Sequence, residues 1–471
     1  VFMHGRSKLT HRLHSTEPCP GLPINPSSEK TIMTKFHLLP VFIAFSTAFA
    51  VPVHAQSLIE LYESARSYDA TFKSAQSQYQ ATLARADQAR AGIYPTANLS
   101  AGVSRSNLDS SLSASERVFG AQTATISASQ PIYRPANVAS YEQGKKQADV
   151  AQAQLKSAEQ DLVVRVSQAY FDVLASQDSL AFVTAQKAAV SEQLASAKRN
   201  FEVGTSTITD SREAQARFDL VVAQEIAAEN DLRIKKIALD QLVGKSAATP
   251  KALATPVVLP ALSPSDVGAW VSQSEENHPG VIQSRLALDV AQLETRKAEA
   301  GHKPTLDLTG SYAIAHNDGT STSTLNSRTN VATIGLAFNL PLFAGFATQN
   351  RIKETLALED KARTDLESTQ RTVAQGTRTA FFGVLSGTGQ VKALEAAEAS
   401  SQSALDANKL GYQVGVRINI DVLNAQSQLF QTKRDLAKAR YDVLVGGLKL
   451  RQANGTLTAD DLQGINAMLV K

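Results

Sequence analysis

The stretch "NFEVGTSTITD" at residues 200–210 has a near copy, "GYQVGVRINID", at residues 411–421. Both stretches carry Val-Gly at their fourth and fifth positions, and both end in Asp. A Val-Gly pair that interrupts a helical pattern is typical of a helix C-cap, where glycine takes a positive φ. The duplication therefore predicts two helical hairpins in one chain, each bent at one of these turns.

The similarity between the two halves of the chain extends well beyond the turns. "AYFDVL" at residues 169–174 aligns with "AFFGVL" at residues 380–385, so the offset is 380 − 169 = 211. "AGIYPT" at residues 91–96 aligns with "AGHKPT" at residues 300–305, which gives 300 − 91 = 209. A nearly constant offset indicates that one structural unit occurs twice.

The N-terminal region has the pattern of an export signal. Met33 opens a stretch with Lys35 as its positive residue, a short apolar run and a small-x-small cleavage motif at residues 53–55. The apolar run is too short for a membrane-spanning helix, and a short amphipathic anchor is the alternative. The predicted segments are an untranslated or processed extension (1–32), a signal peptide (33–55), a first repeat (56–245), a Pro-rich connector (246–265), a second repeat (266–455) and a C-terminal tail (456–471).

The composition argues against several functional classes. The net charge is +3 and Lys and Arg are scattered, which argues against a nucleic-acid partner. Cys19 is the only cysteine and precedes the predicted cleavage site, so the mature chain would have neither disulfides nor thiol catalysis. No Ser-His-Asp set or Gly-rich phosphate loop occurs, and His278, His302 and His316 lack partners at metal-ligand spacing. We therefore expect no enzyme activity, no cofactor and no metal site.

Most of each half has a helical pattern. Apolar and small residues recur every three or four positions through residues 155–201 and 420–448, which is the period of a coiled coil. A helix over residues 136–202 would be about 100 Å long at 1.5 Å per residue. Shorter helical patterns cover residues 58–92 and 266–301. The predicted fold is mainly α, with long antiparallel coiled-coil helices joined by the Val-Gly turns.

Four short segments alternate between apolar and polar residues, which is the period of a β-strand. One-sided apolar strands of this kind are the pattern of an outer-membrane barrel. An antiparallel sheet that covers a soluble core is the alternative. Long polar loops at residues 105–122 and 315–330 join the segments of each pair. The predicted strands are residues 96–104, 123–130, 305–312 and 333–340.

Four strands are too few to close a transmembrane barrel, because the smallest bacterial barrels have eight. An open four-stranded sheet would leave two unpaired edges, which lipid does not tolerate. If the strands are transmembrane, several copies of the chain must contribute to one barrel. Two, three or four copies would give a closed barrel, and the pattern of residues does not choose among them.

The chain resembles the TolC family of outer-membrane efflux and type I secretion proteins over residues 57–455. The resemblance rests on the signal peptide, the twofold repeat, the strand pairs ending at Pro131 and Pro341, and the stretch at 411–430. It implies a homotrimer with a twelve-stranded barrel in the outer membrane of a Gram-negative bacterium. It also implies a helical tunnel across the periplasm that docks on a periplasmic adaptor and on an inner-membrane transporter, either ABC-type or proton-driven.

The resemblance also assigns functional positions at the two turns. Val203 and Gly204, with Val414 and Gly415, would be the tips that contact the adaptor. The gating positions at the periplasmic aperture would be Thr209 and Asp210 in the first repeat and Tyr412, Arg417 and Asp421 in the second, with Asn424 beside them.

Simpler interpretations of these residues stay open. Asp210 and Asp421 would also serve as helix N-caps, because a carboxylate accepts the free backbone N–H groups. In a trimer, each Asp would form a ring of three carboxylates that favours cations and repels itself unless Arg417 pairs with one. Asn424 stands where the family often has a second Asp, which predicts a weaker acidic constriction.

The competing function is a soluble periplasmic coiled-coil adaptor or structural protein. Such a protein would bury the four alternating segments in a sheet, whereas an exit duct would expose their apolar side to lipid. The placement of the strands therefore distinguishes the two hypotheses. The residues themselves do not identify the exported substrate.

Overall fold

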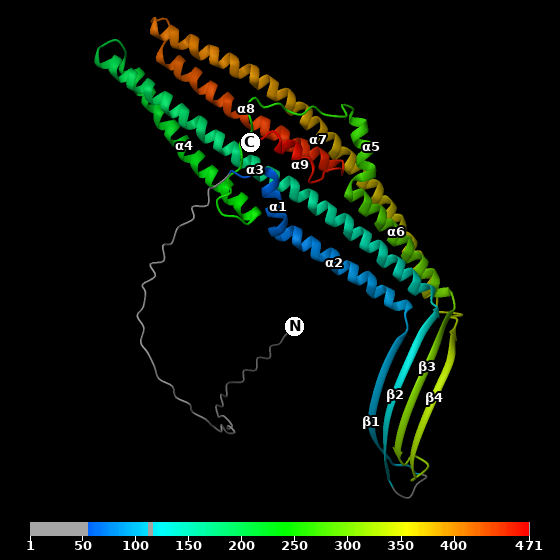
Figure 1. The fold of residues 1–471 in the computed structure, drawn as a ribbon. Helices are drawn as coiled ribbons and strands as arrows, with labels where there is room; N and C mark the ends of the chain where they lie inside the picture. The colour runs from blue at the N-terminus through cyan, green and yellow to red at the C-terminus, as the bar shows by residue number, and fades with distance from the viewer. Residues whose placement is uncertain (1–54, 112–115, 471) are drawn as a thin grey trace, which may run out of the picture. The chain divides into compact units, whose positions relative to one another are not determined.

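The computed structural model describes residues 55–111 and 116–470. The predicted extension with Cys19, and nearly all of the predicted signal peptide, lie outside these residues. In the described chain, one order of elements occurs twice: two helices, two strands, a long helix and a shorter helix (Figure 1). The first set is α1 (Leu58–Tyr68), α2 (Ala70–Arg90), β1 (Thr96–Leu108), β2 (Arg117–Tyr133), α3 (Pro135–Glu202) and α4 (Ile208–Val243).

The second set follows after an extended connector. It comprises α5 (Val267–Asn277), α6 (Pro279–Glu299), β3 (Thr305–Asp318), β4 (Asn326–Asn339), α7 (Ala347–Gln413) and α8 (Asn419–Ala453), and α9 (Asp461–Asn466) ends the chain. Single 3₁₀ turns, η1 (Ala91–Ile93) and η2 (Ala300–His302), precede the first strand of each pair. The helix α3 has 68 residues and α7 has 67. Each is therefore about 100 Å long, which is the length predicted for the helix over residues 136–202.

The long helices pack as two hairpins. α3 packs along α4, α7 packs along α8, and α3 also packs along α8, which joins the hairpins. The predicted seam of α3 is buried at Val166, Val173, Val183 and Val190. Phe201, expected on the same seam, is exposed because it lies in the last turn of α3, where the chain bends away. None of the helices within the described residues is long and apolar enough to cross a membrane.

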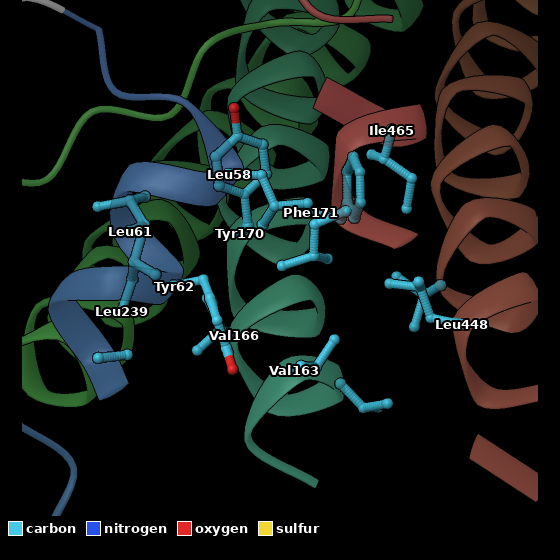
Figure 2. Close-up of a cluster of buried hydrophobic side chains, with 14 of the residues drawn as sticks. Leu58, Leu61, Tyr62, Val163, Val166, Tyr170, Phe171, Leu239, Leu448 and Ile465 are labelled. Carbon is cyan, nitrogen blue, oxygen red and sulfur yellow. The ribbon is translucent and has the colours of Figure 1, made fainter. Parts of the chain in front are cut away.

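The largest core cluster lies around the middle of α3. Figure 2 shows Tyr170 and Phe171 of α3 together with Leu58 of α1, Leu448 of α8 and Ile465 of α9. The Phe171 ring stacks on the Tyr441 ring of α8 with 5.5 Å between the ring centroids. This cluster ties the two repeats and the C-terminal helix together.

The two shorter helical patterns each contain a break that the prediction missed. Asp69 separates α1 from α2, and its carboxylate accepts the Phe72 N–H at 2.7 Å and the Arg165 guanidinium at 3.1 Å. His278 separates α5 from α6, because the residue before Pro279 is disfavoured in the helical region. Both breaks are polar caps inside an otherwise helical pattern.

The four strands form one antiparallel sheet in the order β1-β2-β3-β4. All four are longer than predicted, and the predicted loops at 105–122 and 315–330 are too long. The strand pairing of β1 with β2 continues through polar pairs such as Arg105 opposite Gly120. These residues do not alternate between apolar and polar, so the sequence pattern did not predict them as strand. β1 ends at Leu108 and β2 begins at Arg117, and residues 319–325 connect β3 to β4. β1 and β4 are the edges of the sheet: β1 pairs only with β2 and β4 only with β3 in the described chain.

The apolar side of the sheet is exposed. Val103 is 82% exposed and Ile334 is 80% exposed, and Leu99 and Leu336 are exposed on the same strands. The described helices bury their apolar residues against one another instead. The alternative of a sheet that covers a soluble core therefore does not describe this chain.

Candidate functional site

The first Val-Gly turn joins α3 to α4. Val203 is the C-cap of α3, and Gly204 follows with φ +78°. The N–H groups of Thr205 and Ser206 donate to the Asn200 carbonyl over 2.8 and 3.2 Å, which closes the end of the helix. A Cβ on Gly204 would meet no atom within 4 Å, so glycine is needed here for its backbone angle alone. The turn thus presents an open, exposed tip.

The second turn, between α7 and α8, has the same geometry. Val414 is the C-cap, Gly415 has φ +82°, and the Val416 and Arg417 N–H groups donate to the Gly411 carbonyl. A Cβ on Gly411 would lie 2.7 Å from Arg417 Cγ, so the arginine stem packs directly over this glycine. The predicted C-cap role of both Val-Gly pairs is therefore seen, and their contact with an adaptor stays a prediction.

Asp210 is the third residue of α4 and not its N-cap, which corrects the simpler expectation. Thr207 is the N-cap, and it exchanges hydrogen bonds with Asp210 in a capping box. The Asp210 carboxylate accepts the Ser206 hydroxyl at 2.7 Å and the Thr207 hydroxyl at 2.8 Å. These bonds, the Ser206 hydroxyl first, hold the pKa of Asp210 below its usual range.

Asp421 occupies the equivalent third position of α8 in a different setting. Ile418 is the N-cap there and makes no side-chain bond, so the Asp421 carboxylate has no capping hydroxyl beside it. It lies 3.6 Å from the Arg417 guanidinium instead. The structure thus brings Arg417 and Asp421 together within one chain. Asp210 therefore completes a helix cap in the first repeat, whereas Asp421 forms an ion pair in the second.

Two further contacts join the hairpins near their tips. Asn200 Nδ2 of α3 donates to the Tyr412 hydroxyl of α7 over 3.3 Å. Arg217 Nη2 of α4 donates to Asn424 Oδ1 of α8 over 2.7 Å. Thr209 is exposed, and its side chain makes no hydrogen bond or ion pair in the described chain. Tyr412 and Asn424 therefore face the first repeat, through partners that the sequence did not reveal.

Asn419 is a third residue that the sequence did not reveal. It is 1% exposed, its side chain pairs with Gln193 of α3, and its Nδ2 lies 3.5 Å from the Asp210 carbonyl. A buried amide with partners on α3 and α4 fixes how the start of α8 lies against the first hairpin. Asparagine at a helix start is common, so the residue type alone gave no signal.

The site as a whole is a set of polar contacts at helix ends. Its members can form and break hydrogen bonds and ion pairs, which suits a latch. In the described residues, no group of three or more His, Cys, Asp or Glu side chains is arranged to hold a metal ion.

Known proteins resemble the chain over nearly its whole length. The outer membrane protein TolC of Vibrio cholerae serotype O1 is 33% identical over 434 residues, which covers 92% of this chain and 98% of that protein. The alkaline protease secretion protein AprF of Pseudomonas aeruginosa is 29% identical over 438 residues, which covers 91% of each chain.

A solved structure has the same fold. The CmeC outer membrane channel of Campylobacter jejuni matches with a TM-score of 0.74 at 16% identity, over 87% of this chain and 89% of that one. The sequence profile of the family described as outer membrane efflux protein matches residues 61–245 and 270–456. The chain therefore belongs to the outer membrane efflux protein family.

Proposed function

We propose that this chain is an exit duct in the outer membrane of a Gram-negative bacterium, which serves efflux or type I secretion. The observation that carries the proposal is the sheet with its apolar side exposed, continued by the helices α3 and α7, each about 100 Å long. A lipid layer would cover such a sheet, and the hairpins are long enough to reach far into the periplasm. Relatives named for outer-membrane location and for protease secretion support the same use.

The proposed duct is a homotrimer. Each copy contributes four strands, so three copies would give a twelve-stranded barrel in which the edges β1 and β4 are paired. The duct has no energy source of its own. A periplasmic adaptor at the hairpin tips and an inner-membrane transporter, ABC-type or proton-driven, would deliver the substrate, and outer-membrane lipid would surround the barrel.

The gate of the proposed duct lies at the hairpin tips. Two closing contacts join the hairpins, the bonds from Asn200 to Tyr412 and from Arg217 to Asn424, and the Arg417–Asp421 pair fixes the turn of the second hairpin. Breaking the two bonds would let the second hairpin move away from the first. The exposed tips at Val203 and Val414 are the proposed contacts with the adaptor.

Cell fractionation followed by reconstitution tests the proposal. We expect the mature chain in the outer-membrane fraction, extracted only by detergent, as an oligomer that gives ion-conducting channels in planar lipid bilayers. The competing hypothesis of a soluble periplasmic adaptor predicts a water-soluble chain without channels. Recovery of a soluble monomer from the periplasm would therefore overturn the proposal.

A further inference from the structure

We propose that Arg105, His316 and Arg328 bind the phosphate groups of a phosphorylated glycolipid in the outer leaflet of the membrane. The inference rests on the duct proposed above, because it needs the apolar side of the sheet to face lipid. It adds a specific binding site on that side and names the chemistry of the lipid that occupies it.

The sheet has one end near the helices and one end away from them. Each strand joins a helix or a connecting segment at the first end, and the other strand ends form what we call the outer end of the sheet: Leu108, Arg117, Asp318 and Asn326. Figure 1 shows this end far from the helices. Because the proposed duct has its helices in the periplasm, the outer end faces the outside of the cell.

The apolar side of the sheet becomes charged only near the outer end. Side chains alternate along a strand, so Arg105 lies on the same side as Val103, and Arg328 lies on the same side as Ile334. The strand pairing keeps these residues in register without a shift between β1 and β2 or between β3 and β4. In the described strands, the charged and titratable residues on this side are Arg105, His316, Asp318 and Arg328.

The two arginines have no partner within the chain. Both are exposed, and neither guanidinium makes an ion pair or a hydrogen bond among the described residues. Asp318 is the one carboxylate on this side of the described strands, and it lies 3.5 Å from His316 Nε2. Arg328 stands directly opposite His316 in the pairing of β3 with β4. Basic groups therefore lie side by side here, with guanidinium donors left for an anion that the chain does not supply.

The depth of these residues in the proposed barrel matches the level of lipid headgroups. Leu306 is the first apolar residue of β3 on this side, and His316 lies 316 − 306 = 10 residues further along the strand. Ten residues of strand extend over about 34 Å. A strand tilted by about 40° converts this length into about 25 Å of depth, which is the height of the apolar band of an outer-membrane barrel. The basic residues therefore lie where the apolar band ends.

Phosphate is the anion that this arrangement fits. A guanidinium donates two parallel hydrogen bonds to a phosphate group, and its stem packs along apolar surface. The outer leaflet of a Gram-negative outer membrane consists of glycolipids that carry several phosphate groups at this level. Arg105 and Arg328 lie on the two edge strands, about 14 Å apart at three strand spacings. They therefore contact separate phosphate groups, which favours a lipid with more than one.

Binding of deep-rough lipopolysaccharide to the delipidated, detergent-purified protein tests the site, with native mass spectrometry as the measurement. We expect Arg105→Gln with Arg328→Gln to bind it about tenfold more weakly than the native chain, because charge-assisted hydrogen bonds are lost. Enzymatically dephosphorylated lipopolysaccharide should bind the native chain as weakly. The matched control is Arg117→Gln, which removes a cation at the outer end on the polar side of the sheet, where Arg117 donates to the Ser321 carbonyl. This control should keep the native affinity.

The outcomes separate the inference from the proposed function. Equal affinity of the native chain and the double variant, or of intact and dephosphorylated lipid, would overturn the site. An equal loss in Arg117→Gln would also overturn it, because attraction would then not depend on the side of the sheet. Inorganic phosphate that binds as tightly as the lipopolysaccharide would overturn the assignment to a glycolipid. These results require variants that conduct as native channels do, whereas a native chain without channels would contradict the proposed duct itself.

Discussion

Asn200 in the last turn of α3 donates to the Tyr412 hydroxyl in the last turn of α7 over 3.3 Å. The contact joins the tips of the two hairpins within one chain. The equivalent contact, from α7 to the last turn of α3, cannot form. Phe201 occupies the position of α3 that is equivalent to Tyr412, and it has no hydroxyl. The two copies of the turn thus differ in the chemistry that they bring to the proposed gate.

Removing this hydroxyl should loosen the tips without disturbing their packing. Tyr412→Phe keeps the ring beside Leu405, Val422 and Leu429 and deletes one hydrogen bond, worth about 1 kcal/mol net. We expect a modest rise in single-channel conductance in planar bilayers. Asn200→Ala should give the same rise, and the double variant should add little to it. Fully additive effects would show that the two side chains act separately.

Charge at the aperture should set ion preference. Asp421→Asn removes one carboxylate per copy, so we expect a lower cation-to-anion permeability ratio from reversal potentials. Asn424→Asp adds a carboxylate one helical turn away, where Arg217 now donates to the amide oxygen, and should raise the ratio. Unchanged selectivity in both variants would mean that these positions do not line the pore.

The cap of α4 should contribute measurably to stability. Thr207→Ala removes the hydroxyl that accepts the Asp210 N–H, and loss of such a cap costs about 1 kcal/mol. We expect a lower midpoint of thermal unfolding in detergent, followed by circular dichroism. Thr209→Ala is the matched control, since that exposed side chain has no partner in the described chain. Equal effects of both substitutions would contradict the assigned cap.

A partly buried carboxyl should make stability depend on pH. Asp178 of α3 accepts the Tyr441 hydroxyl at 2.7 Å, and burial raises the pKa of Asp178 above its usual range. The folded state therefore favours the protonated carboxyl. Its stabilising contribution is complete below the unfolded pKa, about 3.9, and is lost as pH rises through the folded pKa.

Asp178→Asn should remove that loss, because the neutral amide still offers an oxygen to Tyr441. We expect the melting temperature of the variant, relative to the native chain, to be higher at pH 7 than at pH 4. Asp442→Asn changes an exposed carboxylate on α8 and serves as the control. A variant whose relative stability does not change with pH would show that folding does not raise the pKa of Asp178.

Much of the fold could be predicted from local pattern and repetition. The coiled-coil period located α3 and α8 because their seams are regular over many turns. The ends of the strands could not be predicted, since pairs such as Arg105 with Gly120 are held by backbone hydrogen bonds and not by apolar side chains. The break at Asp69 was missed for a related reason, because its Arg165 partner lies 96 residues away.

The site was predicted only in part. The duplicated turn pointed to Asp210 and Asp421 and the family resemblance to Arg417, because their contacts lie near their own turn, and their gating role stays a prediction. Partners on the other hairpin, Arg217 and Asn419, could not be found in this way. They are polar residues on helices. From a single sequence, a polar side chain that faces solvent cannot be distinguished from one that contacts the other hairpin.

Single-channel conductance of the Arg417→Ser variant tests the central claim of a duct latched at its hairpin tips. The substitution breaks the pair with Asp421, 3.6 Å away, and keeps the backbone of the turn. Lys409→Ser, which removes another exposed cation near the end of α7, is the control. We predict channels in planar bilayers whose conductance rises severalfold in Arg417→Ser and stays at the native value in Lys409→Ser. Channels of native conductance in Arg417→Ser would contradict the latch, and the absence of channels from the native protein would contradict the duct.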